Sequence, residues 1–572
     1  MKLQNNINMI KSFALVALSS AMIAGCSDYL DVDKDTDYPT TAPLNLLLTN
    51  TQVSLSSVTD FNVNGGQILA VYTHQMTTRE DPDQYGAKVD DISMNNDWDN
   101  VYLTLTDIES LIKQSTESGD LVYAGIGKIQ KAYLMSLAVD LWGDVPFSQS
   151  TQLEAGIIAP KFDNQEDIYD AVFDLIDAGK ADVLTNAGTK KPAADDLFYA
   201  GNKDKWVRFA NTLKLKLYNQ TRLATNFDQA GFDALITENN FFQSNADDFE
   251  FKHFNVVAPT AERNRLFRDS YESTQFGAYQ SPWFYEVMKG MNPNIHNGNA
   301  DPRLNYYFYN QLKPNQFPPD QGVTATGNPG ADYWDKSTGF FSIRFGSTGP
   351  DRDKSAENSY TYPGIFQCGG RYNDGLGGSV ATFNSTTFFQ GKGIAPKRIL
   401  TYDEFLYIQA ELIEVGKLTG SASAKLQAAM VASFAKVDQV VANSGTTQVV
   451  PVLSGTPAVN TFIANVIAEY NAAVGPKKLE VIMTQKWVAT AGDPTDQYSD
   501  YRRTGFPVLA NPLSTTQEYQ LNNGDAFPLN DAQTVLNNPY QVSLFWPQSE
   551  LNSNASAPGQ KNPATYKIFW DN

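Results

Sequence analysis

The segment LVYAGIGKIQKAYLMSLAVDLWGDVPFSQS, residues 121–150, shows the pattern that dominates this chain. Its apolar residues recur at intervals of three and four, which is the spacing of one face of an amphipathic helix. Gly143 and Pro146 then form a turn that ends the helix, and Asp144 can bond to nearby backbone. We therefore predict a helix that packs one face into a core. The stripe consists of Val122, Ile126, Ile129, Tyr133, Leu137 and Leu141.

Other segments repeat this helical pattern. Stripes with the same spacing occur over residues 206–217 and 405–415, and breaks such as Ser118-Gly119-Asp120 divide neighbouring segments into hairpin-like pairs. Paired helices in series are typical of helical repeats, but no self-similarity at about 34 residues is legible. Further helices are predicted at about 46–58, 64–78, 94–114, 165–180, 228–237, 274–289, 421–443, 459–473 and 476–490.

Residues 311–397 differ in kind from the helical segments. They are rich in Gly, Pro, Asn, Ser and aromatic residues, and they show almost no helical stripe. Loops of this length in a compact protein are usually functional or disordered. Their tyrosines and tryptophan favour an ordered, loop-rich lobe. A second irregular region, residues 506–572, is predicted to pack across the helical body.

The first residues have the layout of a secretory signal. Lys2 and Lys11 precede an apolar run over residues 13–23, which is too short for the roughly 20 residues that a membrane-spanning helix needs. Its end, Ile23-Ala24-Gly25-Cys26, resembles a bacterial lipobox, although an ordinary signal with a chance cysteine is the alternative. We predict a signal peptide over residues 1–25 and acylation of Cys26, followed by an acidic tether over residues 26–45.

Composition excludes several classes of function. The net charge of −20 and the lack of a Lys/Arg stripe exclude a nucleic-acid partner. The aspartates after Cys26 do not form a calcium loop, because Thr36 and Ala42 stand where Gly and Glu are needed. The chain has three histidines, and none has metal-ligand spacing. We expect neither a metal ion nor a cofactor, and Cys26 and Cys368 are not an obvious disulfide pair.

No pattern of catalytic residues stands out. The chain lacks a nucleophile elbow and a phosphate-binding glycine loop. Paired carboxylates are common in so acidic a chain, so composition alone does not exclude a glycosidase. The sequence therefore favours a binding protein over an enzyme, with a surface glycoside hydrolase or peptidase as the alternative.

Eight segments, in order, resemble signature segments of SusD/RagB-like proteins, the nutrient-binding outer-membrane lipoproteins. Each is short, but eight in order behind a lipobox are specific, and they span essentially the whole mature chain. Lys216 stands where the family has Arg, and Leu412 where Ala is commoner. The segments are DLWGDVPFSQS (140–150), FDNQEDIYD (162–170), GNKDKWVRFANTLKLKL (201–217), DPRL (301–304), RILTYDEFLYIQAEL (398–412), TQKWVAT (484–490), SDYRRTGFPVL (499–509) and FWPQSELNSN (545–554).

The resemblance implies an all-α fold of tetratricopeptide-like helix pairs with a large irregular lobe, here over residues 46–572. It implies a non-catalytic lipoprotein of the outer membrane, facing the medium, that captures an oligosaccharide, or in some members a peptide. It also implies a SusC-like TonB-dependent transporter as the partner that receives the ligand. A purely structural transporter subunit is a further alternative.

Most of these segments have a structural explanation. Asn211 sits in an amphipathic helix and can serve a buried polar network. Arg303, Arg502, Arg503 and Glu411 can pair as guanidinium and carboxylate groups. We expect these residues to hold the scaffold.

Ligand binding is therefore expected in the loops, because a sugar needs an aromatic surface with polar side chains beside it. The packing of a loop onto the body is the alternative for each residue. That alternative is favoured for Trp98, which has Tyr102 and Leu105 at helical spacing, and it is evenly balanced for Trp334. The candidates are Tyr333, Trp334, Tyr360, Tyr362, Phe366, Arg371, Tyr372 and Asn373 in the irregular lobe, with Trp98 and Tyr85 as a second set.

Overall fold

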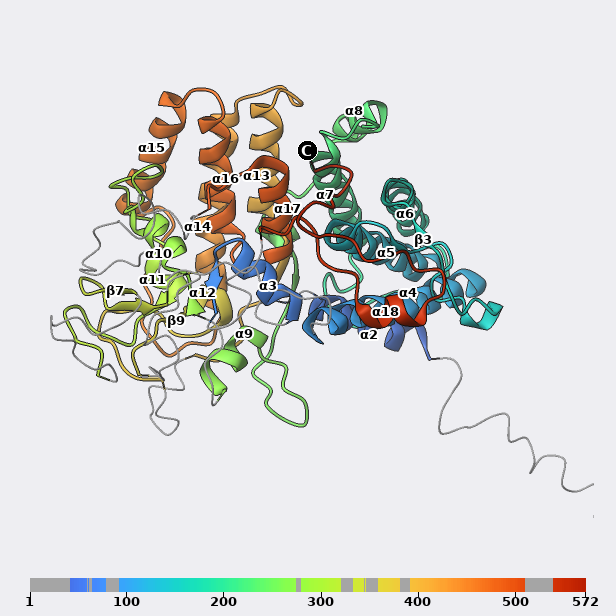
Figure 1. The fold of residues 1–572 in the computed structure, drawn as a ribbon, viewed down its shortest axis with the longest axis horizontal. Helices are drawn as coiled ribbons and strands as arrows, with labels where there is room; N and C mark the ends of the chain where they lie inside the picture. The colour runs from blue at the N-terminus through green and yellow to red at the C-terminus, as the bar shows by residue number, and fades with distance from the viewer. Residues whose placement is uncertain are drawn as a thin grey trace, which may run out of the picture.

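The structure is a computed structural model. It describes residues 42–58, 60, 64–78, 92–273, 279–319, 333–343, 345, 358–380, 391–509 and 539–571. Two groups of helices lie side by side, and a lobe of short strands and loops lies below one of them (Figure 1). The predicted fold of paired helices with an irregular lobe is confirmed.

The first helical group follows the predicted stripes closely. The helix predicted from residues 122–141 is α5, and its neighbours in sequence are also its neighbours in space. The group consists of α2 (Leu44–Ser57), α3 (Asn64–Tyr72), α4 (Ile92–Ser118), α5 (Leu121–Trp142), α6 (Gln165–Thr185), α7 (Lys203–Thr221) and α8 (Gln229–Glu238).

Two glycines allow α5 and α6 to cross closely. A Cβ atom on Gly125 would lie 2.5 Å from the carbonyl oxygen of Gly179, and one on Gly179 would lie 2.8 Å from that of Gly125. Backbone atoms cannot move aside as side chains do, so any larger residue at either position would separate the helices. Among the described helices, α5 and α6 pack against each other more extensively than any other pair.

The second helical group forms a bundle. Helices α13 to α16 stand side by side in Figure 1, and α13 also contacts α7, which joins the two groups. Capping residues begin several of these helices: the Ser421 side chain accepts a hydrogen bond from the Ala424 backbone, and that of Thr456 from the Val459 backbone. The bundle consists of α13 (Tyr402–Glu414), α14 (Ala422–Asn443), α15 (Pro457–Ala472), α16 (Lys477–Ala489) and α17 (Pro494–Thr504).

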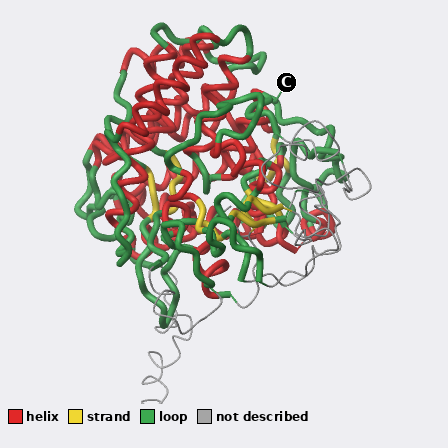
Figure 2. Tube along the Cα trace, turned by 90° about the vertical axis from the view of Figure 1, so that its left-hand side faces the viewer, coloured by secondary structure: helices red, strands yellow, loops and turns green. Residues whose placement is uncertain are grey.

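Short antiparallel strands lie among the helices and loops, as Figure 2 shows. The strand pairs are β1 (Met76–Thr77) with β5 (Tyr279–Gln280), β2 (Val145–Pro146) with β3 (Phe162–Asp163), β4 (Phe249–Phe251) with β10 (Lys397–Leu400), β6 (Phe308–Tyr309) with β9 (Tyr362–Pro363), and β7 (Tyr333–Asp335) with β8 (Phe340–Ser342). The remaining helices are η2 (Leu153–Ala155), η3 (Asn245–Asp247), α9 (Arg265–Phe267), η4 (Arg268–Glu272), α10 (Pro282–Lys289), α11 (Leu304–Tyr307), α12 (Ile365–Cys368) and α18 (Gln548–Ser553).

Several of the predicted helices have wrong boundaries; those predicted over residues 94–114 and 165–180 continue to Ser118 and Thr185. The helix predicted over residues 274–289 begins only at Pro282, because Tyr279–Gln280 is a strand and Ser281 caps the helix with its side chain. The helix predicted over residues 64–78 ends at Tyr72 and is followed by strand β1. Helix α17 was not predicted at all. Cys368 is a buried free thiol.

Candidate functional site

We call residues 304–319, 333–343 and 358–380 the loop lobe. Backbone hydrogen bonds hold its segments together: the Gly364 N–H donates to the carbonyl of Tyr307 at 2.6 Å, and the Gly378 N–H donates to that of Gln311 at 2.8 Å. The Gln311 side chain adds a bond to the carbonyl of Tyr360 at 2.8 Å. The lobe is therefore an ordered scaffold for the eight candidate residues that the sequence places in it.

Four of these candidates lie in the interior of the loop lobe. Tyr333, Tyr360, Tyr362 and Phe366 are each at most 5% exposed. The Tyr333 hydroxyl donates to Glu286 at 2.9 Å, whereas the other three rings pack against Tyr279, Tyr271 and Tyr307 at centroid distances of 4.7, 5.1 and 4.8 Å respectively. Their surroundings match the packing alternative, in which the rings fill the lobe.

Three further candidates form one short stretch. The guanidinium of Arg371 stacks 4.3 Å from the ring centroid of Tyr309, and Asn373 is buried against the backbone of Asn305. Tyr372 is only partly buried, and its ring meets Tyr306 at 4.9 Å. Tyr372 is therefore the most exposed of the three side chains.

Trp334 is distinct among the tryptophans. The chain has eight tryptophans, and the seven others are at most 3% exposed. Trp334, on strand β7, is partly exposed. Its indole N–H, like those of the buried Trp142 and Trp283, has no hydrogen-bond partner in the described part of the chain. Neither property favours stability, because large rings gain from full burial and buried donors cost free energy when they are unpaired. This combination marks Trp334 as the best candidate for ligand contact.

The turn that contains Asn315 and Phe317 packs beside Trp334. The ring of Phe317 meets it at 5.8 Å and 75°, and the backbone of Asn315 donates to Lys336 O at 2.7 Å, which fixes this turn against the hairpin. The sequence did not single out Phe317, because Phe317 and Trp334 are distant in sequence and come into contact only in the folded chain.

A buried carboxylate anchors the hairpin that carries Trp334. Asp335 accepts hydrogen bonds from the Tyr285 hydroxyl at 2.6 Å, from the Ser337 backbone at 2.9 Å and from Lys289. Burial alone would raise the pKa of Asp335, but hydrogen bonds from Lys289, Tyr285 and Ser337 hold it below its usual value. Trp334 is thus fixed on a preorganised turn rather than on a loose loop.

The second predicted set is only partly described. Tyr85 and Cys26 lie outside the described residues. Trp98, on α4, is 3% exposed and packs edge-on against Trp142 at 5.4 Å, which fits the core interpretation. It nevertheless borders a surface pocket of about 450 Å³, which is also lined by Asp99, Tyr102, Leu103, Thr106, Pro146, Ser150, Thr151, Pro160 and Glu550.

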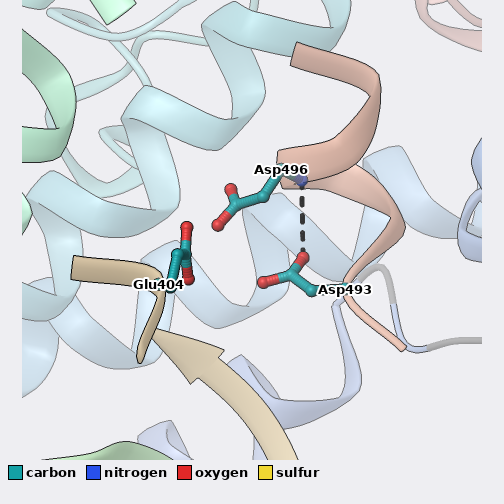
Figure 3. A group of neighbouring side chains, drawn as sticks. All are labelled: Glu404, Asp493 and Asp496. Carbon is teal, nitrogen blue, oxygen red and sulfur yellow. Dashed lines mark hydrogen bonds between the residues drawn. The ribbon is translucent and has the colours of Figure 1, made fainter. Parts of the chain in front are cut away.

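Three buried carboxylates meet between α13 and α17 (Figure 3). Glu404, Asp493 and Asp496 each place one carboxylate oxygen within 4.8 Å of the others, and the Asp496 backbone donates to Asp493 at 3.4 Å. Lys216 forms an ion pair with Asp496, and the ammonium of Lys486 lies 3.5 Å from Glu404. Because two ammonium groups face these carboxylates, we interpret the group as a buried charge network and not as a metal centre.

The comparisons with known proteins give the family. A SusD-like family model, described as "Starch-binding associating with outer membrane", matches residues 36–332 and 347–528. The chain belongs to this SusD-like family. No curated protein sequence matches it.

Solved structures share the fold of this SusD-like protein. A SusD homologue from Bacteroides fragilis is 17% identical with a TM-score of 0.65, covering 93% of this chain and 99% of that one. A SusD/RagB family protein from Bacteroides thetaiotaomicron is 19% identical with a TM-score of 0.63 and the same coverage of 93% and 99%. A chitin-binding SusD homologue from Flavobacterium johnsoniae is 18% identical with a TM-score of 0.61, covering 92% and 98%. At these identities the likeness shows the fold alone.

Membership of the family decides the class of function. SusD-like proteins are nutrient-binding proteins without catalytic activity, so this chain is not an enzyme. The family is associated with the outer membrane. In the part of the chain that the structure describes, no helix is long and apolar enough to cross a membrane.

The family-like segments of this SusD-like protein hold its scaffold, as predicted. Arg503 and Glu411 form a buried pair, whereas Arg303 pairs with Asp301 at 2.6 Å. Arg502 donates to the carbonyl of Val542 at 2.9 Å. Asn211 joins a polar network, in which its amide donates to Glu238 at 2.8 Å. Asn211, Glu411, Arg502 and Arg503 lie on helices of the body. Arg303, just before the loop lobe, donates to Gln485 of α16 at 2.9 Å.

The buried carboxyl of Asp493 is predicted to make the stability of the protein depend on pH, and the substitution Asp493→Asn is predicted to remove this dependence. Burial raises the pKa of Asp493 from 3.8 to about 8, and the charge of Asp496 adds to the rise. Between these values the folded protein binds more protons at this residue than the unfolded chain does. This contribution to stability is therefore complete below pH 3.8 and is lost as the pH rises through 8.

We expect Asp493→Asn to keep the helix cap, because asparagine caps as well as aspartate. Its free energy of unfolding should match that of the wild type near pH 4 and exceed it near pH 8, with a slope difference of up to about 1.4 kcal/mol per pH unit. Urea denaturation of the wild type and of the variant at several pH values measures the free energies of unfolding and their slopes with pH. Parallel pH profiles for the two proteins would show that Asp493 is not protonated in the folded state.

Proposed function

We propose that this chain captures an oligosaccharide at the loop lobe and passes it to a SusC-like TonB-dependent transporter. The observation that carries the proposal is Trp334, the one tryptophan of eight that keeps an exposed part. A sugar ring presents an apolar face bordered by hydroxyls, so it stacks on an indole while nearby polar groups fix its orientation. Two of the similar solved structures are titled as chitin-binding proteins, which supports a glycan as ligand.

The proposal also concerns the place of the protein in the cell. Removal of the signal peptide before Cys26 would leave a lipid-bearing N-terminus, and the following acidic residues would act as a flexible tether. The domain would then face the medium, beside its transporter. The family's association with the outer membrane supports this placement.

A panel of labelled neutral oligosaccharides, including oligomers of N-acetylglucosamine, tests the proposed ligand class. A set of short peptides is run beside it. We expect the purified protein to retain at least one oligosaccharide series and to release it with unchanged mass, because the family binds without cleaving. Retention of peptides alone would assign the chain to peptide capture, and shortened oligosaccharides would contradict a binding role. Heat-unfolded protein is the control for non-specific retention.

A further inference from the structure

A second pocket lies at the end of the molecule away from the loop lobe. Its lining comes mainly from α6, from α7 and from the segment that leads to α8. In Figure 1 these helices and β7 lie at opposite sides of the molecule. The volume of the pocket is about 260 Å³. We call it the α6 pocket. Its lining consists of Glu166, Tyr169, Asp170, Phe173, Asp174, Tyr218, Thr221, Asn226, Phe227, Asp228 and Phe569.

The wall of the α6 pocket is a continuous series of aromatic rings. Phe569 meets Tyr169 at 5.0 Å, Tyr169 meets Phe173 at 6.3 Å, Phe173 stacks on Tyr218 at 4.6 Å, and Tyr218 meets Phe227 at 5.8 Å. The rings come from α6, from the end of α7, from the loop that follows it and from the C-terminal segment. The tertiary fold alone brings them together.

Four carboxylates line the α6 pocket beside these rings. Glu166, Asp170 and Asp174 follow one another at intervals of four along α6, so they share one face of the helix. Asp228, which caps α8, adds a carboxylate from the segment between α7 and α8. The Asn226 amide donates to Glu166 at 3.3 Å and links the α7–α8 loop to α6.

The lining of the α6 pocket is negatively charged, and the two lysines that lie over its rings, Lys214 and Lys417, are outside the lining. No lysine or arginine belongs to its lining. Asp170 and Asp174 make neither a hydrogen bond nor an ion pair with any residue that the structure describes. Burial, together with the charges of Asp167, Asp174 and Asp228, raises the pKa of Asp170 above its usual value, which reflects the crowding of negative charge.

Two lysines of the chain itself make cation–π contacts with rings of this pocket. The Lys417 ammonium lies 4.3 Å from the ring centroid of Phe227, and that of Lys214 lies 5.8 Å from the ring centroid of Tyr218. Lys214 is paired with Asp177 at 2.6 Å and does not line the cavity. A cation within about 6 Å of an aromatic face is attracted by the ring. The rings around the pocket are therefore suited to cations, and its carboxylates add the matching charge.

From these observations we propose that the α6 pocket binds an organic cation, namely a primary ammonium or guanidinium group such as a lysine or arginine side chain presents. The pocket is smaller than the roughly 300 Å³ at which sites for larger ligands begin, so it fits one side chain rather than an oligosaccharide. This site is separate from Trp334 and does not depend on the proposed function.

Calorimetric titration of the full chain at low ionic strength tests the site. The probe is a tetralysine amide, with its fully acetylated form as the uncharged control. Butylammonium is titrated in parallel. Its binding shows whether the pocket takes a free amine, and binding of tetralysine alone shows that it requires a side chain within a peptide. We expect tetralysine to bind and its acetylated form not to bind. The affinity should fall with added salt, because exposed charges are screened.

Variants show whether the binding occurs in this pocket. Asp170→Asn with Asp174→Asn should weaken tetralysine binding about three- to tenfold, and Phe227→Leu about threefold, since leucine keeps the bulk but not the aromatic face. The matched control is Glu117→Gln with Glu154→Gln, which removes two exposed charges outside the pocket. Circular dichroism verifies the fold of each variant.

Three results would overturn the proposal. One is an equal loss of affinity in the control variant, which would show attraction to the acidic surface in general. The second is unchanged affinity in the Asp170/Asp174 variant, and the third is equal binding of the acetylated peptide. Because Asp170 and Asp174 are exposed, their variants remain informative even if Phe227→Leu fails to fold.

Discussion

Replacing Glu411 by alanine is expected to lower the free energy of unfolding by about 3–5 kcal/mol. Glu411 is fully buried on α13 and receives Arg503 at 2.8 Å, the Asn219 amide at 2.8 Å and Arg222 at 3.0 Å. Burial alone would raise its pKa, but Arg503 and Arg222 hold the pKa of this carboxyl below its usual value. The substitution leaves two buried guanidinium groups without their shared carboxylate, where water cannot replace it.

Urea denaturation followed by far-ultraviolet circular dichroism measures this loss. The matched control is Asp269→Ala, which breaks the partly exposed Arg265–Asp269 pair on one turn of helix. Such surface pairs contribute about 0.3–0.5 kcal/mol, so this variant should stay close to the wild type. A cost below about 1 kcal/mol for Glu411→Ala would mean that Glu411 does not join α7, α13 and α17 as described.

Replacing Trp334 by alanine is expected to weaken oligosaccharide binding about 30-fold or more without unfolding the protein. Truncation of a tryptophan at the centre of a binding site typically costs about 2 kcal/mol or more, which corresponds to that factor. The fold should survive because Trp334 is partly exposed, and its supports, Asp335 and the β7–β8 pairing, remain. Calorimetry with an oligosaccharide retained in the panel gives the affinity, and the melting temperature checks the fold.

Tyr402→Ala is the control for this experiment. It removes a partly buried ring on α13, outside the loop lobe, and should leave affinity unchanged. If Trp334→Ala binds the oligosaccharide as tightly as the wild type does, Trp334 is not part of the site. In that case the pocket beside Trp98 becomes the place to search.

The sequence predicts most helices because their apolar stripes are what the core requires. Helix α5 departs from its predicted ends by one residue at each side. Helix α17 was missed because it has no apolar stripe. It reads PTDQYSDYRRT, and its buried residues include Asp496, Asp500 and Arg503. These side chains are buried through ion pairs with partners on other helices, and a pattern search for apolar residues does not detect such pairing.

The site is less predictable than the fold because exposure is a tertiary property. In sequence, Tyr333 and Trp334 are adjacent aromatic residues, yet strand alternation turns Tyr333 toward Glu286 and leaves Trp334 partly exposed. The α6 pocket shows the same limit. Its carboxylate spacing on α6 is legible in the sequence, but Phe227 and Phe569 join it only in the folded chain.

The two parts of the molecule thus have different roles in our account. The helical body is held by the close glycine crossing of α5 and α6 and by buried ion pairs, whereas the loop lobe presents Trp334 from an anchored hairpin. A rigid support reduces the ordering that binding would otherwise require. Capture of a sugar at Trp334 therefore needs little rearrangement of the lobe.

A crystal structure of the protein with an oligosaccharide from the panel tests this account most directly. We predict a sugar ring stacked on the indole of Trp334, with its hydroxyls bonded to polar groups of the loop lobe. A sugar bound beside Trp98 or elsewhere, with Trp334 uncontacted, would contradict the central claim.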